Sequence, residues 1–450
     1  MALLSQLFKR PAYHGGVEVY GPRRPLAEPI TRIQPPETVV IPLSQHIGAP
    51  AKPVVEAGAE VEVGSVLGEP QGFVSTYIHS SVKGVVKGLV TLGRPGGGRV
   101  SAVEIQVSAD QPERSSREVD WDRLSGFTPE EIKDKVLKAG IVGMGGAGFP
   151  THVKLSPPKD KPIDSVIVNA CECEPYLAAD SRLVVEAAPE LLAGLRLAMQ
   201  AVGAKKGYIA FEADRVEGIK LLRQLTADFA DVEVKVLPPK YPQGSEKHLI
   251  KSVLGRTVPL GALPMEVGAL VQNVATLISI YRAVLYDEPV THRVVTVNGG
   301  AVANPSNFLV PIGVPIRVLL EAAGWSEEDC AKVVLGGPMM GKTAPSLEEP
   351  VTKTTSGVLA LRQAELGPTE PSPCIRCGRC LAACPMGLYP GYIAEAGIHN
   401  DLEAAEKAGA MACLECGCCA YSCPGNRPLV QEIREAKLKI RQNQQERKGS

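Results

Sequence analysis

The sequence lacks three features that would place the protein in other classes. It has no run of about 18 apolar residues, so no segment is long enough to cross a bilayer as a helix. Its formal net charge is -1, with 22% charged residues, and this balance gives no sign of a nucleic-acid-binding surface. The opening MALLSQLFKR is too short in its apolar part for a secretory signal. These absences indicate a cytoplasmic protein that reaches a membrane only through a partner.

The cysteines are present in number but are not spread evenly. The chain has 450 residues, which predicts several domains rather than a single core. Nine of its 12 cysteines lie between Cys374 and Cys423. A disulfide framework is expected in small exported domains, not in a large chain without an export signal. The clustering therefore indicates metal binding.

The first part of the chain, residues 1–125, alternates short Val-rich runs with Gly turns. This pattern predicts small antiparallel strands. It resembles the barrel-sandwich fold of lipoyl and biotinyl domains, which present a carrier lysine at a hairpin tip. The corresponding turn here, near Gln71 and Phe73, has no lysine, and the nearest one, Lys83, lies in the next turn. We therefore expect this domain to be structural, and to serve as a docking surface rather than a carrier.

Residues 126–290 alternate between helix-like and strand-like segments. Strands are predicted over 163–170, 208–213 and 232–238, and helices over 180–202 and 215–229. The helix over 180–202 is expected to be one long amphipathic element. This alternation is typical of a Rossmann-like parallel sheet covered by helices.

The remaining sequence predicts two further domains. Residues 291–362 read as a strand, a turn, a second strand and a helix, and they resemble the soluble-ligand-binding β-grasp (SLBB) module. Residues 363–450 begin with a Pro- and Gly-containing linker and carry the cysteine region. Its last segment is predicted to be a charged helix that fades into a tail. The expected class is therefore a multidomain α/β protein with a helical cysteine-rich domain.

Two cysteine runs share one spacing. CIRCGRCLAACP begins at Cys374 and CLECGCCAYSCP begins at Cys413. Each follows C-x₂-C-x₂-C-x₃-C-P, the ligand pattern of bacterial two-cluster ferredoxins, in which the fourth cysteine completes the other cluster. We therefore predict two 4Fe–4S clusters, one held by Cys374, Cys377, Cys380 and Cys423, the other by Cys413, Cys416, Cys419 and Cys384.

Two alternatives bear on these ligands. Structural zinc uses paired cysteines separated by a longer gap, whereas triple spacing with a trailing C-P favours clusters. Cys418 lies beside Cys419, and a shift of register would make Cys418 the ligand. Comparison with Cys380 in the first run favours Cys419. The isolated Cys330 is expected to be a core residue.

A glycine-rich stretch, GMGGAGFPT, runs from Gly143 to Thr151 before a predicted strand. It is neither the usual dinucleotide fingerprint nor a phosphate loop with G-K-[ST]. Glycines let a backbone approach a ring system or a phosphate closely, although a plain tight turn has the same composition.

Longer stretches resemble the complex I subunit that oxidises NADH. GMGGAGFPTHVKL matches its flavin loop, and NACECEPYLAAD, YPQGSEKHL and VQNVATL match three further motifs in the same order. The sequence departs from that family at Cys171, Tyr176 and Ser245, and these departures leave the flavin contacts open. For Cys173, between two acids, packing is favoured over a place beside the flavin.

The resemblance implies roles for particular residues. The glycines and Asn273 would cradle FMN, Phe149 and Lys154 would hold NAD(H), and Glu174 would lie near the nicotinamide. Glu174 and Lys154 are the implied catalytic residues. The implied cofactor-binding residues are Gly143, Gly145, Gly146, Gly148, Phe149, Lys154, Asn169, Glu172, Glu174, Tyr241, Gly244, Glu246, Asn273 and Thr276. Each acid could instead be a helix cap or a solvated charge.

Nearly the whole chain resembles the RnfC family, a subunit of the Rnf (or Rsx) ion-translocating electron transport complexes. PLSQHIGAPA, GFVSTYIHSSVKG, ECEPYLAAD, GGPMMGK and both cysteine runs carry this resemblance. The related cobalamin reductase of bacterial microcompartments is the alternative, but that family begins close to its glycine loop. The resemblance implies a peripheral subunit on the cytoplasmic face of the cell inner membrane.

The implied function is electron transfer between NAD(H) and membrane partners, coupled by the complex to Na⁺ or H⁺ transport. NADH gives two electrons at once, a 4Fe–4S cluster takes one, and a flavin can divide the pair. The implied partners are the membrane subunits and a ferredoxin-type subunit, with ferredoxin reached indirectly. A relay and docking subunit without hydride chemistry is the second hypothesis. Sequence does not decide the direction of electron flow, or whether the ion is Na⁺ or H⁺.

Overall fold

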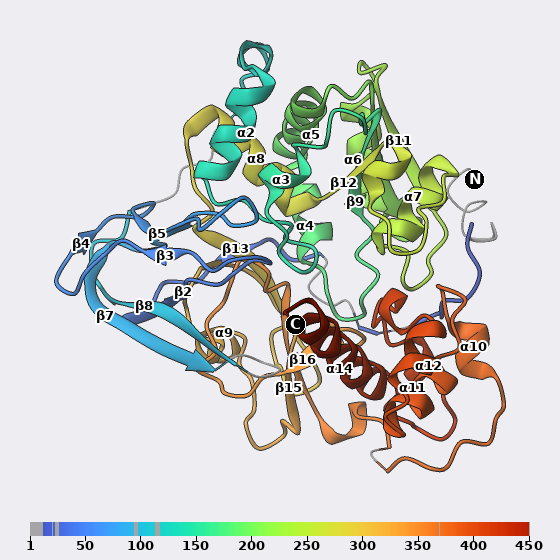
Figure 1. The fold of residues 1–450 in the computed structure, drawn as a ribbon. Coiled ribbons are helices and arrows are strands. Elements are labelled where there is room, and N and C mark those ends of the chain that lie inside the picture. The colour runs from blue at the N-terminus through green and yellow to red at the C-terminus, as the bar shows by residue number, and fades with distance from the viewer. Residues whose placement is uncertain are drawn as a thin grey trace.

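The structure is a computed structural model, and it describes residues 12–19, 21–22, 27–93, 98–112, 118–368 and 370–449. The opening ten residues, which carry the expectation about a secretory signal, lie outside these ranges. Four groups of elements follow one another along the chain (Figure 1). They are a β lobe, a helix-covered parallel sheet, a mixed sheet and a helical cysteine-rich region.

The β lobe consists of two small antiparallel sheets. One has the order β2-β8-β7-β4, with β2 Thr38–Pro42, β8 Arg99–Val107, β7 Gly84–Gly93 and β4 Glu60–Val61. The other has the order β3-β5-β6, with β3 Lys52–Pro53, β5 Val66–Glu69 and β6 Ile78–His79. Their inward side chains are fully buried and form the lobe's core. The predicted small antiparallel strands are confirmed, and Lys83 is engaged in an ion pair with Asp110 at 2.8 Å.

The central sheet has four parallel strands in the order β11-β10-β9-β12. They are β9 Ser165–Ala170, β10 Lys206–Glu212, β11 Val232–Leu237 and β12 Ala269–Asn273. The first three strands were predicted and are confirmed; β12 was not predicted as a strand. Alternate residues of the strands face opposite sides, because the side-chain period of a strand is two. Val166 and Leu270 join the core beneath α5 and α8, whereas Ile167 and Val271 pack with α7.

One predicted helix was wrong. Residues 180–202 do not form a single helix but two, α4 Ala179–Glu186 and α5 Ala188–Val202, separated at Ala187. Pro189 explains the break, because proline has no N–H and clashes with the carbonyl four residues earlier. Proline is tolerated in the first turn of the second helix, where it now lies. The other helices of this region are α2 Pro129–Lys138, α3 Thr151–Lys154, α6 Val216–Leu225, α7 Glu246–Leu254 and α8 Val274–Tyr286.

The mixed sheet has six strands in the order β1-β14-β13-β17-β15-β16. They are β1 Thr31–Arg32, β13 His292–Asn298, β14 Ser306–Pro311, β15 Lys332–Leu335, β16 Lys342–Thr343 and β17 Gly357–Leu361, with helix α9 Ile316–Ala322. The predicted strand, turn, strand and helix are β13, β14 and α9. β1 comes from the N-terminal part of the chain and pairs in parallel with β14, so this sheet joins distant segments.

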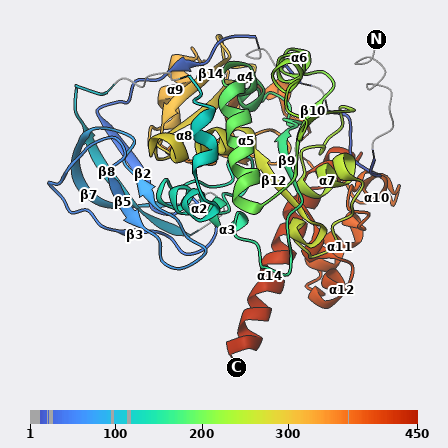
Figure 2. The ribbon, with the colours of Figure 1, turned by 90° about the horizontal axis from the view of Figure 1, so that it is seen from above.

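The cysteine region is helical, with a small core of its own around Ile393, Ile433 and Ile440. Its helices are α10 Arg379–Ala383, α11 Pro390–Ile398, α12 Leu402–Lys407, α13 Cys418–Tyr421 and α14 Leu429–Gly449. The predicted tail is shorter than expected, because α14 continues to Gly449; its C-terminal end projects beyond the other elements (Figure 2). Among the described residues, no helix is both long and apolar enough to cross a membrane.

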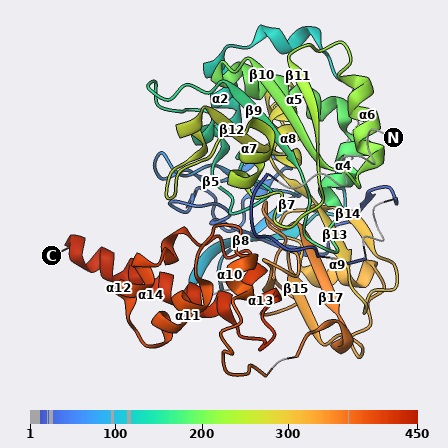
Figure 3. The same ribbon diagram turned by 90° about the vertical axis from the view of Figure 1, so that its right-hand side faces the viewer.

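The cysteine region lies against both the central sheet and the mixed sheet (Figure 3). The N-terminal segment 12–19 fastens this junction. The N–H of Gly16 donates to the carbonyl of Ala383 at 2.9 Å, and Val17 forms an isolated β-bridge with Tyr241. This segment therefore lies against the second and fourth parts of the chain, not within the β lobe.

Candidate redox site

The glycine loop, residues 143–148, lies between Val142 and Pro150, which form an isolated β-bridge just before α3. Gly145 and Gly146 are exposed, and a Cβ placed on Gly146 would meet nothing within 4 Å. Gly148 has a φ of 71°, a conformation that favours glycine. The loop thus presents open backbone at its tip, as a close approach by a cofactor requires.

Side chains of β12 and α8 hold the loop from below. The Thr276 hydroxyl accepts a hydrogen bond from the N–H of Met144 at 3.0 Å and lies 3.2 Å from the carbonyl of Val142. Asn273 caps α8, its Oδ1 accepting from the N–H of Ala275 at 2.9 Å. A Cβ on Gly145 would lie 2.8 Å from Asn273 Nδ2. Glycine is therefore required at position 145 by its close contact with Asn273.

A buried group of charges lies behind Asn273. Asn273 Nδ2 donates to Asp180 Oδ2 at 2.5 Å, while the other carboxylate oxygen of Asp180 has no hydrogen-bond partner among the described residues. Glu172 accepts from the N–H groups of Asp180 and Ser181, both at 3.1 Å. Burial raises the pKa of Glu172 to about 7. The guanidinium of Arg293, which is 2% exposed, offsets the burial of Asp180, whose pKa is nonetheless raised. Sequence reasoning missed Arg293.

Lys154 and Glu246 meet at the edge of the sheet. Lys154 Nζ donates to Glu246 Oε1 and to the carbonyl of Val271, both at 2.8 Å. Asn169 Nδ2 donates to the carbonyl of Gly244 at 2.7 Å. These two contacts join residues from all four motifs of the predicted flavin region, although Val271 takes part only through its backbone. Phe149 is half-buried beside the loop.

Glu174 lies in a less open position than its implied place near a nicotinamide. Its carboxylate oxygens accept from the N–H groups of Met339 and Met340, both at 3.0 Å. A Cβ on Gly337 would come within 2.3 Å of Glu174 Oε2, so the GGPMMGK loop closes tightly on this acid. Burial raises the pKa of Glu174 to about 7, although its hydrogen bonds oppose the shift. The glycines of that motif were the signal, unused in the sequence analysis, for this close approach.

Tyr241 links the central domain to the second cysteine run. Its side chain is 1% exposed, and its hydroxyl donates to the carbonyl oxygen of Cys416 at 2.8 Å. On the same side, a Cβ on Gly417 would lie 2.8 Å from the carbonyl oxygen of Met339. The chain around Cys416 therefore packs directly on the loop that holds Glu174.

The second set of predicted cluster ligands faces one space. Cys384, Cys413, Cys416 and Cys419 all line a small apolar cavity together with Leu388 and Ile393. Cys418 does not line it and packs instead with Tyr241 and Ala383. Four thiols around one cavity are the donor set that a 4Fe–4S cluster needs. This geometry favours Cys419 over Cys418.

The first set is more open. Cys374 and Cys377 are exposed, and Cys380 and Cys423 are half-buried. The N–H of Ser372 donates to the carbonyl of Gly425 at 2.8 Å, which places the start of the first run beside the end of the second. In the described residues, no three metal-binding side chains surround a single point closely enough for one ion.

The departures from the complex I motifs have local explanations. Tyr176 has a φ of 69°, so it keeps the left-handed backbone that glycine adopts most readily. Its hydroxyl donates to Glu365 at 2.8 Å. Cys171 is buried and its thiol points toward the carbonyl of Ala210 at 3.4 Å. The Ser245 hydroxyl is 3.0 Å from His248 Nδ1. These contacts are structural.

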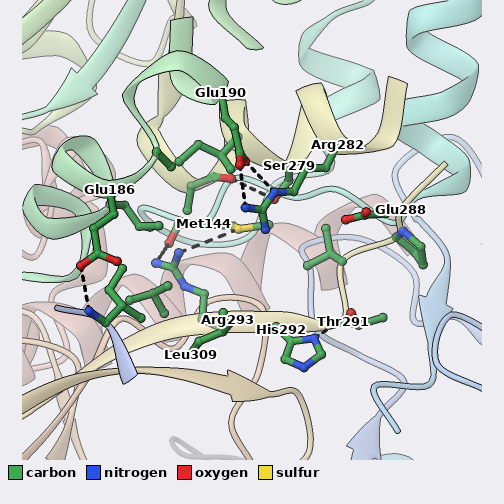
Figure 4. Close-up of a pocket in the computed structure, with 18 of the residues that line it drawn as sticks. Met144, Glu186, Glu190, Ser279, Arg282, Glu288, Thr291, His292, Arg293 and Leu309 are labelled. Atoms are coloured by element: carbon green, nitrogen blue, oxygen red, sulfur yellow. Dashed lines mark hydrogen bonds and ion pairs between the residues drawn. The ribbon is translucent and has the colours of Figure 1, made fainter. Parts of the chain in front are cut away.

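A larger cavity of about 280 Å³ lies elsewhere, between the α4–α5 junction, α8 and β13 (Figure 4). None of the predicted cofactor-binding residues lines it. Polar contacts occupy its walls: Arg282 contacts Glu190 at 2.6 Å, and the guanidinium of Arg293 donates to the carbonyl of Met144 at 3.2 Å.

The fold and the site define a multidomain flavin and iron–sulfur redox protein. Comparison with family models agrees with this class. Residues 136–282 match the Nuo51 FMN-binding domain, and residues 369–424 match the 4Fe-4S dicluster domain. Residues 11–110 match the RnfC barrel sandwich hybrid domain, and residues 294–343 match the SLBB domain.

Relatives extend over almost the whole chain. It is 41% identical to the RnfC-type subunit of the Na⁺-translocating ferredoxin:NAD⁺ oxidoreductase complex of Acetobacterium woodii, over 98% of this chain and 99% of that protein. It is 40% identical to the proton-translocating counterpart of Clostridium ljungdahlii, over 96% and 94%. The protein therefore belongs to the RnfC family of subunits of ion-translocating oxidoreductase complexes, and the cobalamin reductase alternative is set aside.

A solved structure shares the fold. The NAD⁺-reducing [NiFe]-hydrogenase in its H2-reduced state superposes with a TM-score of 0.51 at 21% identity. The match covers 71% of this chain and 64% of that one.

Proposed function

We propose that this chain exchanges electrons between NAD(H) and the membrane part of an Rnf complex, through FMN and two 4Fe–4S clusters. Its place is the cytoplasmic face of the inner membrane. Its partners there are the membrane subunits and a ferredoxin-type subunit, with ferredoxin reached indirectly, and the complex couples the transfer to Na⁺ or H⁺ movement. The names of the relatives support this proposal, because they pair ferredoxin:NAD⁺ oxidoreduction with the translocation of Na⁺ in one relative and of protons in the other.

The domain division in the proposal is that of the sequence analysis. Residues 1–125 form the barrel-sandwich domain, 126–290 the FMN and NAD(H) domain, 291–362 the SLBB module and 363–450 the cluster domain. The strand pairing of β1 with the mixed sheet adds a tie between the first and third of these.

The residues present fit FMN. The exposed tip of the glycine loop leaves peptide groups open to it, and the second buried oxygen of Asp180 remains available as an acceptor. Gly143, Gly145, Gly146, Gly148 and Asn273 would hold the flavin. Thr276 and Asn273 keep the loop in place, and Phe149, Lys154 and Glu246 lie where NAD(H) would approach.

The bound groups supply the chemistry that side chains lack, since FMN accepts a hydride and releases single electrons to 4Fe–4S clusters. The chain's own contribution is position. The GGPMMGK loop encloses Glu174 and keeps water from it, and Lys154 carries a positive charge that can meet phosphate. Backbone and apolar side chains surround the second set of cysteines and exclude solvent there.

One observation carries the proposal: the Tyr241 hydroxyl, the Met339 backbone and the second cysteine set meet in one buried cluster. The proposed cluster ligand Cys416 is thereby held against the same loop that holds Glu174. An electron path from the nucleotide site to the cysteines has no solvent gap to cross at this junction.

The relay hypothesis is favoured by a different observation. Both oxygens of Glu174 are already engaged by backbone N–H groups, as a purely structural acid would be. A subunit that only relays electrons would keep this contact without hydride chemistry.

The deciding experiment uses the purified chain, reconstituted anaerobically with iron, sulfide and FMN. NADH is added while visible absorbance and EPR are recorded together. Flavin bleaching followed by the signals of reduced 4Fe–4S clusters is the expected result. Clusters that are reduced by dithionite but not by NADH, in a chain that retains FMN, would contradict the proposal and support the relay hypothesis.

A further inference from the structure

Exposed apolar side chains gather around the first cysteine set. Of the 18 large hydrophobic side chains exposed in the described residues, seven lie between Ile375 and Leu438. Four of them are close to the first set: Ile375 is 72% exposed, Leu381 38%, Tyr389 60% and Tyr392 58%. Large apolar groups that cluster on a surface mark sites where another protein binds.

The fold brings these four side chains together around the first run. Ile375 lies between the first two cysteines of the run, and Leu381 directly follows Cys380. Gly391, between the two tyrosines, packs so closely that a Cβ there would be 3.4 Å from the sulfur of Cys380. We call Ile375, Leu381, Tyr389 and Tyr392 the cluster-1 patch.

Two arginines border the cluster-1 patch. Arg376 and Arg379 are exposed, and neither forms an ion pair within the part of the chain that the structure describes. Other arginines of the same domain are paired: Arg427 contacts Glu432 at 3.2 Å, and Arg434 contacts Glu415 at 2.8 Å. The unpaired charges give the patch a positive rim, and a partner with carboxylates at its edge would complement that rim.

The two cysteine sets differ in access, which gives the relay a direction in space. The second set lines an apolar cavity against Tyr241 and the Met339 loop, whereas Cys374 and Cys377 of the first set are exposed. The second set therefore faces the nucleotide site and the first set faces outward. Electron transfer to another protein requires close approach, and the exposed first set permits it.

We propose that the cluster-1 patch is the docking face for a one-electron carrier subunit of the same complex, whose own contact face is apolar with a carboxylate rim. The proposal rests on the function proposed above and names the surface through which electrons leave or enter. One electron crosses at a time: the partner's carrier is reduced by one electron, the cluster of the first set is oxidised by one, and no bond forms or breaks.

The experiment measures binding of the purified, cofactor-loaded chain to the detergent-solubilised membrane part of the complex from cells that lack this chain. The double variant Tyr389→Ser/Tyr392→Ser removes apolar contacts, and Arg379→Glu reverses one rim charge. Matched controls on α14 are Leu438→Ser, where Leu438 is 56% exposed, and Arg441→Glu at another exposed arginine. Binding is followed at two ionic strengths.

We expect the tyrosine variant to bind about 10-fold or more weakly, because buried aromatic side chains dominate interface energies. Arg379→Glu should weaken binding at low salt and lessen its salt dependence, since rim charges act through screened attraction. Unchanged binding of both patch variants, or equal losses in the α14 controls, would overturn the proposal. NADH-driven cluster reduction in the same samples reports separately on the proposed function, because the patch contains none of the residues assigned to FMN or NAD(H).

Discussion

The hydroxyl of Tyr241 donates a hydrogen bond to the main-chain carbonyl of Cys416 at 2.8 Å, inside a contact that joins the central sheet to the cysteine-rich domain. The bond ties a residue of the third complex I-like motif to a predicted cluster ligand. Tyr241 was expected to bind a nucleotide cofactor. Its buried hydroxyl instead holds the backbone of the second cysteine run, so its role in electron transfer is to position.

Replacing Tyr241 by Phe tests this role. The variant leaves the Cys416 carbonyl buried and unpaired, which costs about 1–3 kcal/mol. We expect the thermal transition of the cysteine-rich domain to fall by a few degrees, and the EPR spectrum of one cluster to change while the other does not. Tyr389→Phe, at an exposed tyrosine, is the control. An unaltered spectrum and thermal transition would show that the hydroxyl does not hold the cluster loop.

The ligand assignment predicts different results for neighbouring cysteines. Cys384→Ser should lose one cluster and about half of the iron, because the fourth cysteine of one run completes the other cluster. Cys418→Ser should keep both clusters, since Cys418 packs outside the shared cavity. Iron content and EPR spin quantitation of reduced samples decide the matter. Loss of a cluster in the Cys418 variant would reverse the assignment of Cys418 and Cys419.

Thr276→Val tests the support beneath the glycine loop. The substitution keeps the shape of the side chain but leaves the Met144 N–H without its acceptor at 3.0 Å. A lost buried hydrogen bond costs about 1–3 kcal/mol, so FMN should bind roughly 10-fold more weakly. Fluorescence titration of the flavin-free chain measures this. The matched control is Thr226→Val, a buried threonine whose hydroxyl donates within α6 to Leu222, away from the loop. Equal affinities in the two variants would argue against a role for Thr276.

Glu174→Gln separates hydride chemistry from relay. If Glu174 takes part in the NADH reaction, the variant should lose NADH oxidation while both clusters remain reducible by dithionite. The stability of the folded chain adds a second readout. The pKa of Glu174 is raised to about 7, so the folded state binds more protons than the unfolded one between the ordinary carboxyl pKa and 7, and its stability falls as pH rises through that range. The variant should lack this part of the decline. Normal NADH turnover in the variant would favour the relay hypothesis.

Lys353 predicts a pH dependence of the opposite sign. Its ammonium is 1% exposed and donates to the carbonyls of Tyr77 and Gly140, at 2.8 and 2.7 Å. Burial lowers the pKa of Lys353 from 10.5 to about 7. Between these values the unfolded chain holds the extra proton, so this group's contribution to stability rises with pH from 7 to 10.5.

The comparison of the wild-type chain with Lys353→Met isolates that contribution. The difference in thermal midpoint between the two proteins should widen in favour of the wild type as pH rises from neutral. Differential scanning calorimetry at several pH values measures it. Parallel pH profiles would mean that Lys353 keeps the same protonation state in both the folded and unfolded chains.

Much of the fold was predictable because its signals are local. Alternating Val-rich runs predicted β9, β10 and β11, and the spacing of the cysteines predicted which residues would gather. The single helix predicted over 180–202 was wrong because the apolar period continues across the break, while Pro189 interrupts the hydrogen bonds that the period does not report. β12 went unpredicted because its five residues were interpreted only as a motif.

The candidate site was less predictable, because its contacts join residues distant in sequence. Nothing near Glu174 in the chain indicates that Met339 and Met340 donate to it. Arg293 carries no motif, yet it lies beside the buried acids Glu172 and Asp180 and the carbonyl of Met144. Such groups become partners only when burial removes water and leaves them no other choice.

The sequence by itself determined the kinds of chemistry in this protein: thiols spaced for two cubane clusters, glycines that leave a backbone open, and acids next to strand ends. These properties depend on residue type and short spacing. The tertiary structure alone decided their order in space. It set the second cysteine run against Tyr241 and the Glu174 loop and turned the first toward solvent, because packing between domains buries one set of thiols and leaves the other exposed.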